Sequence, residues 1–239
     1  MDARRLSVEA VVLRSMRYGE ADRILHAVTP EHGRVSAIAK GARRPRSKLG
    51  GRLEPLSAVR LELQRGRGDL MTVVGADTLV VHHRILTAHA ALETAQRAAL
   101  VVDRVCVPDE PAERVHGLLR TLLALLDEAP DRGGEGMALA FELKLLYALG
   151  LQPVLTTCAA CGRPDGLAGF DPVAGGVVCS ACRRGAPPIG AAAVGFMLEA
   201  LGRPLAEAPA LERPAAGEVE RALTGLAAEH LGVDLRRRG

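Results

Sequence analysis

Two closely spaced cysteine pairs constrain this chain more than any other feature of its sequence. The pairs are Cys158-Ala-Ala-Cys161 and Cys179-Ser-Ala-Cys182, with 17 residues between them. Two residues between cysteines let both sulfur atoms face one ion from a tight turn, a spacing typical of four-cysteine zinc sites. Four thiolates complete a tetrahedron and leave no position for water, so we predict one structural Zn²⁺ per chain.

The alternative interpretation of these cysteines is a pair of disulfides, which would require an oxidising compartment. The start of the chain, MDARRLSVEAVV, lacks the basic, apolar and small-residue regions of a secretory signal. No apolar run reaches the roughly 18 residues that a membrane helix needs. We therefore expect a cytoplasmic protein without membrane contact. The fifth cysteine, Cys106, lies in an apolar helical stretch and is predicted to be buried.

The first 80 residues have the pattern of a small β-barrel. Short runs rich in Val, Ile and Leu are separated by glycine-containing turns, and apolar and polar residues alternate around residue 60 as in a half-buried strand. The expected strands cover residues 6–13, 24–28, 35–39, 59–64 and 70–74. Five short strands with such turns predict a closed or partly closed barrel.

Helical periodicity replaces this pattern after residue 80. Apolar residues recur at helical spacing over 85–107 and 115–126, and 137–149 is apolar nearly all round, which predicts a buried helix ended by Gly150. Residues 194–201 and 219–231 are further expected helices. The predicted fold class is α+β and multidomain. It comprises a nucleic-acid-binding barrel at 1–80, a helical domain in two parts at 81–157 and 186–239, and a zinc finger at 158–185.

Positive charge is concentrated in the predicted barrel. Residues 1–80 hold 15 Lys and Arg against 9 Asp and Glu, whereas the remainder holds 16 against 19. No acidic residue lies between Glu31 and Glu54, and much of this segment is expected to be a flexible loop that follows a phosphate backbone. The predicted nucleic-acid-binding residues are Arg34, Lys40, Arg43, Arg44, Arg46, Lys48 and Arg52. Further cations that extend this footprint are Arg14, Arg17, Arg23, Arg60, Arg65 and Arg67.

The sequence contains no pattern that predicts catalysis. It has no GxxxxGK[ST], HExxH or GxSxG motif, and its acidic residues are scattered. Tyr18 is the sole aromatic residue among the first 80, so binding is expected to depend on charge and to accept single and double strands of any sequence. Two alternatives stay open: a zinc-ribbon RNA-binding or ribosome-associated factor, and a zinc-dependent nuclease or hydrolase.

Several segments, in matching order from about residue 6 to residue 200, resemble the bacterial RecO family of recombination mediators. They are Tyr18–Leu25 (YGEADRIL), Ala39–Arg44 (AKGARR), Phe141–Leu146 (FELKLL), Leu149–Leu151 (LGL), and the four cysteines with Gly175–Cys179 (GGVVC). The resemblance implies an OB-fold barrel, a helical domain and a zinc finger. It places Lys40, Arg43 and Arg44 on the basic segment of the barrel and the four cysteines on the finger.

The resemblance also implies a role in recombinational repair. A member of this family is expected to bind single- and double-stranded DNA, to anneal complementary strands and to work with the partner RecR. It is further expected to contact the acidic tail of single-strand-binding protein and to help load RecA onto DNA that this protein coats. The last 35 residues resemble the family least. Such a protein would be associated with the nucleoid.

Overall fold

A computed structural model describes residues 5–66, 68 and 70–236 of the chain. The chain divides into two compact units, residues 1–131 and 132–239. Two helices that follow the strands therefore belong to the same unit as the strands. The sequence suggested four parts, whose boundaries lie where strands, helices and the cysteine segment follow one another. That these parts are separate domains stays a prediction.

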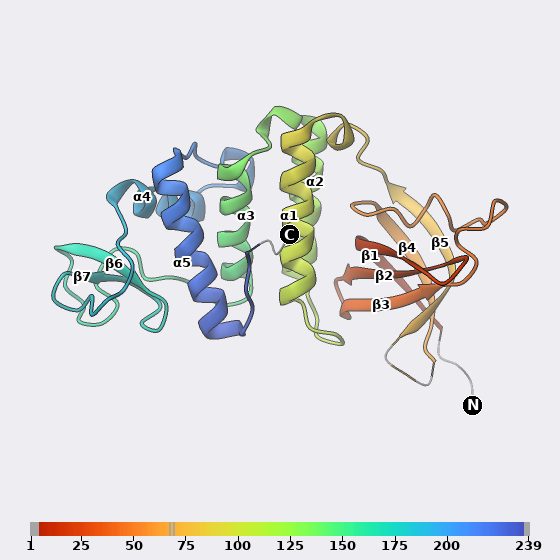
Figure 1. Ribbon diagram of the computed structural model, residues 1–239, viewed down its shortest axis with the longest axis horizontal. Helices are drawn as coiled ribbons and strands as arrows, with labels where there is room; N and C mark the ends of the chain where they lie inside the picture. The colour runs from red at the N-terminus through yellow and green to blue at the C-terminus, as the bar shows by residue number, and fades with distance from the viewer. Residues whose placement is uncertain (1–4, 67, 69, 237–239) are drawn as a thin grey trace. The chain divides into compact units, whose positions relative to one another are not determined.

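The first unit contains five strands that form a closed barrel in the order β1-β2-β3-β5-β4 (Figure 1). Their bounds are β1 (Arg5–Tyr18), β2 (Asp22–Thr29), β3 (Gly33–Ala39), β4 (Ala58–Gln64) and β5 (Met71–Val80). Strand β1 is long enough to pair with both β2 and β4, and its register shifts between Val12 and Arg14. The sheet is mixed, because β3 and β5 pair in parallel at Ala37–Met71 and Ile38–Thr72. All five predicted strands are present, and β1 and β5 continue beyond their predicted ends at residues 13 and 74.

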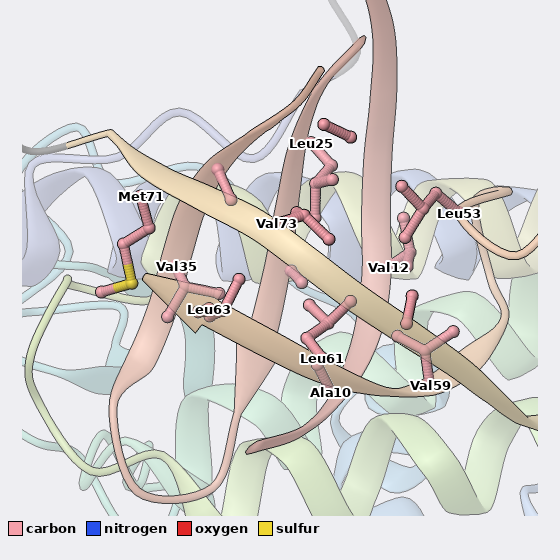
Figure 2. Packing of buried hydrophobic residues seen from close by; sticks show 14 of the residues in the cluster. Ala10, Val12, Leu25, Val35, Leu53, Val59, Leu61, Leu63, Met71 and Val73 are labelled. Atoms are coloured by element: carbon pink, nitrogen blue, oxygen red, sulfur yellow. The ribbon is translucent and has the colours of Figure 1, made fainter. Parts of the chain in front are cut away.

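Aliphatic side chains fill the barrel. Residues of β3 alternate between buried and half-buried along its whole length, as expected of a strand with one face inside. Leu25, Val35, Leu61 and Leu63 converge in the interior, where Figure 2 shows their side chains between the strands. Leu53, which lies outside the strands, joins the same cluster. The segment between β3 and β4 is therefore held to the barrel by hydrophobic burial.

Helices α1 (His89–Val105) and α2 (Glu113–Glu128) complete the first unit, after the short 3₁₀ helix η1 (Ile85–Thr87). Both helices contact β1 and β2. The predicted helical face of α2 is buried at Val115, Leu119, Leu122, Leu123 and Leu126. Cys106 follows α1 and is buried as predicted, and this burial raises the pKa of its thiol to about 12. The thiol therefore stays protonated and unreactive at neutral pH.

The second unit is built around α3 (Glu135–Ala148), which packs against α4 (Ala191–Gly202) and α5 (Arg213–Leu231). Buried residues run through α3 from Met137 to Leu146, so the predicted buried helix is confirmed, and Gly150 follows its end with a left-handed φ of 89°. Helix α5 begins at Arg213, earlier than the predicted residue 219, and Pro214 lies in its first turn, where proline is tolerated. The unit also contains the hairpin β6 (Leu167–Asp171) and β7 (Gly176–Cys179) and the 3₁₀ helix η3 (Leu205–Glu207). A further 3₁₀ helix, η2 (Pro130–Arg132), contains residues 131 and 132, at which the chain passes from the first unit to the second.

Of the helices that the structure describes, none combines the length and the apolar composition needed to cross a bilayer.

Candidate metal centre and nucleic-acid interface

The four predicted ligands meet in the second unit. The Sγ atoms of Cys158, Cys161, Cys179 and Cys182 all lie within 4.8 Å of one another. Zn–S bonds of about 2.3 Å would place the corners of a tetrahedron about 3.8 Å apart, and the Cys161–Cys179 Sγ separation is 3.9 Å. These four side chains therefore fit a single tetrahedral metal ion.

Two tight turns bring the sulfur atoms together. In the first, the Gly162 N–H donates to the Cys158 carbonyl at 2.8 Å, and Gly162 has a φ of 75° that a side chain would strain. In the second, Cys179 ends β7 and its carbonyl accepts from the Cys182 N–H at 3.0 Å. The Ala159 N–H donates to the carbonyl of Val177 at 2.7 Å, which ties the first turn to β7. We call residues 158–182 the cysteine knob.

Two thiols of the knob, those of Cys158 and Cys179, are biased toward ionisation by backbone hydrogen bonds. The backbone N–H of Cys179 donates to Cys158 Sγ at 3.3 Å and is the main cause that lowers the pKa of Cys158 to about 6. The backbone N–H of Cys182 likewise lowers the pKa of Cys179. By contrast, the pKa of Cys182 is raised to about 12, mainly by a hydrogen bond with Cys161 and to a smaller extent by one with Cys179. A divalent cation would remove this imbalance, because it allows all four sulfur atoms to bind as thiolates.

The predicted nucleic-acid-binding residues lie mainly on the segment between β3 and β4, residues 40–57, which we call the basic loop. Arg34 is the exception, since it lies within β3. Four side chains of the basic loop are exposed and have no hydrogen-bond or ion-pair partner among the described residues. They are Lys40, Arg44, Arg46 and Lys48. Because these cations have no protein partners there, they are available to an anion from solution.

The other two predicted cations of the basic loop hold it in place. The Arg43 Nη1 donates to the carbonyl of Glu20 at 3.1 Å, and the Arg52 Nη1 donates to the carbonyl of Ala76 at 2.6 Å. Arg52 also pairs with Asp77 at 3.2 Å. These guanidinium groups join the basic loop to the β1–β2 turn and to β5. Their positive charge is therefore partly neutralised by groups of the protein itself.

Burial and hydrogen bonds hold the basic loop to the barrel, although its sequence suggested a flexible segment. Ala42 and Leu53 are buried against the barrel core, and Leu49 packs beside them. The Leu56 N–H donates to the Val12 carbonyl at 2.8 Å, and the Gly41 N–H donates to the Asp22 carboxylate at 2.7 Å. Apolar residues spaced between the cations anchor the loop, so the free charges are presented from an ordered surface.

Arg34 and several cations of the proposed wider footprint have partners inside the first unit. Arg34 donates through Nη1 to the carbonyl of Asp103 at 3.1 Å, and Arg14 pairs with the Asp103 carboxylate at 3.5 Å. Arg23, Arg60 and Arg65 pair with Glu54, Glu9 and Asp109 respectively. Arg17 is exposed, and Arg67 lies outside the described residues. For Arg34 a structural role competes with the predicted DNA contact, which stays a prediction.

Asp103 is a residue that the sequence did not single out. Its side chain is 5% exposed, and its carboxylate accepts a hydrogen bond from His26 Nδ1 at 2.8 Å in addition to the contact with Arg14. It therefore ties α1 to β1, β2 and β3 at one buried point. The sequence around Asp103 does not reveal this role, because the partners of its carboxylate lie about 70 to 90 positions earlier in the chain.

We expect Asp103→Ala to lower the free energy of unfolding of the first unit by about 3 kcal/mol, because clustered cations lose a buried counter-charge. Urea unfolding measures the change in the free energy of unfolding, with hydrogen exchange of the β1, β2 and β3 amides as the probe. The matched control is Asp77→Ala, whose exposed pair with Arg52 is worth at most about 1 kcal/mol. Equal costs for the two variants would contradict the assigned role of Asp103.

Comparison with known proteins matches almost the whole chain, in two parts that divide near the end of β5 and not at the boundary between the two compact units. Residues 1–80 match the family model described as the N-terminal part of recombination protein O, and residues 90–239 match the model of its C-terminal part. The DNA repair protein RecO of Anaeromyxobacter dehalogenans strain 2CP-C is 36% identical over 251 residues, covering 98% of this chain and 94% of the relative. The DNA repair protein RecO of Rubrobacter xylanophilus is 40% identical over 207 residues, covering 83% of this chain and 81% of the relative.

Proposed function

The chain belongs to the RecO family of DNA repair proteins, and we propose on this basis that it is a DNA-binding recombination mediator that works without catalytic turnover. The observation that carries the proposal is the ordered basic loop, with four cations that have no partner among the described residues. In a protein of DNA repair, a polynucleotide backbone is the polyanion that such a surface fits.

The strand order of the barrel supports a nucleic-acid-binding fold. Five strands close as β1-β2-β3-β5-β4, with β3 and β5 parallel, and we assign this arrangement to the OB fold. Binding through phosphates alone does not depend on base sequence, so single and double strands are both proposed ligands. Four phosphate contacts on a single strand would give log K a slope of roughly −3 against log salt.

The cations also account for annealing. Two complementary strands repel each other through their phosphates, and a surface that neutralises part of this charge lets them approach and pair. No bond is made or broken in the protein, so no catalytic residue is required. We propose that the protein performs this step in repair at the nucleoid.

We propose that the metal of the cysteine knob is Zn²⁺ and that its role is structural. Cys158, Cys161, Cys179 and Cys182 would hold it. With four sulfur ligands the ion has no open position for a water molecule, and its contribution is to fold the knob. This supports a binding protein over a zinc-dependent nuclease.

The proposed partners follow from family membership. We propose that the protein works with RecR, contacts the acidic tail of single-strand-binding protein and helps RecA to load onto DNA coated by that protein. Each of these partners acts on DNA that the barrel would already hold. The proposal therefore places the protein between coated single strands and the recombinase.

Strand annealing tests the proposed function. We expect the protein to raise the annealing rate of complementary oligonucleotides on the order of 10- to 1,000-fold at low salt, with the effect falling as salt increases. The rate is measured by quenching of paired fluorophores, with bare strands and with strands coated by single-strand-binding protein. An annealing rate unchanged by the protein at low salt would contradict the proposal.

Two controls separate the alternatives. Labelled DNA incubated with the protein and magnesium should stay full-length, whereas shorter products would identify a nuclease. In competition, single-stranded DNA should displace a labelled DNA strand at least as well as RNA of the same sequence. A clear advantage for RNA would favour the zinc-ribbon RNA-binding factor.

A further inference from the structure

The chain uses aromatic residues sparingly and places one of them at the surface of the barrel unit. It has five aromatic residues, and its three Phe side chains are all buried in the second unit. Tyr18 is the single aromatic residue in the first 131 positions, and it is 54% exposed. A large ring left open to solvent contributes little to the core and is available to contact a ligand.

Tyr18 lies at the same end of the barrel as the basic loop. It is the last residue of β1 and pairs with Asp22, so their side chains share one face of the sheet with Cβ atoms about 5 Å apart. The Asp22 carboxylate accepts the Gly41 N–H at 2.7 Å. Gly41 lies under the aliphatic stem of Arg44, whose Cδ is 3.5 Å from the position that a Gly41 Cβ would occupy. Tyr18 and Arg44 are therefore linked through three consecutive contacts, by way of Asp22 and Gly41.

The turn that carries Tyr18 is held in place before any ligand arrives. The Arg43 N–H donates to the Ala21 carbonyl at 2.8 Å, and the Arg43 guanidinium donates to the carbonyl of Glu20 at 3.1 Å. Both contacts fix the β1–β2 turn against the basic loop. An aromatic platform whose neighbours are already ordered loses little conformational entropy when a ring stacks on it.

We propose that Tyr18 stacks against one unpaired base of a DNA strand whose phosphates lie along Lys40, Arg44 and Arg46. This inference rests on the proposed function and deepens it. Every base has a π-face, so stacking on Tyr18 adds affinity without sequence preference. Bases inside a duplex are already stacked on one another and do not reach the ring. The result is a preference for single strands over duplex that charge alone does not provide.

Paired affinity measurements on Tyr18→Ala and Tyr18→Phe test this role. We expect Tyr18→Ala to weaken binding of a single-stranded oligothymidylate about 5- to 150-fold and to leave the affinity for a duplex of equal length unchanged. Tyr18→Phe should keep the affinity for the single strand, because the ring remains. An equal loss on both ligands would mean that the substitution damages the surface and would overturn the stacking assignment.

Photochemical crosslinking locates the base independently of any variant. A single strand containing 5-iodouracil should crosslink to the unaltered protein within the tryptic peptide Tyr18–Arg23. Crosslinks found elsewhere and not in this peptide would overturn the inference. If Tyr18→Ala binds single strands normally while loss of the loop cations abolishes binding, DNA binding stands and stacking is wrong. If the unaltered protein binds no DNA, the proposed function itself fails.

Discussion

Removing the proposed Zn²⁺ is expected to unfold the cysteine knob. Structural zinc contributes on the order of 10 kcal/mol of apparent binding free energy at neutral pH, and a segment of this size has little other core. Beyond the cysteines Cys158 and Cys179, the buried cluster of the knob contains Val178. A strong chelator should therefore expose the amides of β6 and β7 to hydrogen exchange and release one zinc per chain by metal analysis.

Thiol reactivity gives a second readout of the same event. Before chelation the four clustered cysteines should react slowly with a thiol reagent, and after chelation they should react quickly. Cys106, whose pKa is raised to about 12 by burial, is an internal control that stays unreactive while the first unit is folded.

Among variants, Cys158→Ser should lose the metal and Cys106→Ala should retain it. Fast reaction of all four thiols in the untreated protein would contradict a metal site.

Neutralising the free cations of the basic loop is expected to remove most DNA affinity. In the variant with Lys40, Arg44, Arg46 and Lys48 changed to Gln, single-strand affinity should fall roughly 10³- to 10⁴-fold at about 50 mM salt. The slope of log K against log salt should flatten by about 3, since each phosphate contact contributes about 0.7. Fluorescence anisotropy at several salt concentrations measures both quantities. The fold should be unaffected, because these side chains are exposed.

A matched pair of double variants controls for net charge. Changing Arg44 and Arg46 to Gln should cost roughly 60-fold at about 50 mM salt. Changing Arg213 and Arg221 to Gln alters the net charge equally, on exposed residues of α5, and should leave DNA affinity nearly unchanged. If both pairs weaken binding equally, the basic loop is not the DNA-binding surface.

Secondary structure was predictable because hydrophobic periodicity is a local property. Alternation in residues 59–64 identified β4, and the nearly continuous apolar stretch from Met137 identified α3. The order in which the strands pair could not be predicted in the same way. The parallel pairing of β3 with β5 joins Ala37 to Met71, and such a contact depends on how the whole sheet twists and closes.

The basic loop shows what a local interpretation of the sequence missed. Glycine, proline and seven cations in and around residues 40–52 suggested a mobile segment, yet Leu49, Leu53 and Leu56 pack it against the barrel. These leucines were visible in the sequence. Their significance was not, because a leucine in a loop is buried only if a hydrophobic surface lies within reach, and here the barrel core supplies that surface.

The amino-acid sequence by itself determined the chemistry that this protein has available. It specified four sulfur ligands whose type and short spacing suit one metal ion, and it specified a surplus of cations in one segment. Tertiary structure alone decided which of these charges face solvent. Arg34 and Arg44 are the same residue type in the sequence. In the structure, Arg34 donates a hydrogen bond to Asp103, 69 positions away, whereas the Arg44 side chain has no partner among the described residues. The physical reason is that a charge is neutralised by what lies within a few ångströms of it, and folding brings distant residues to that distance.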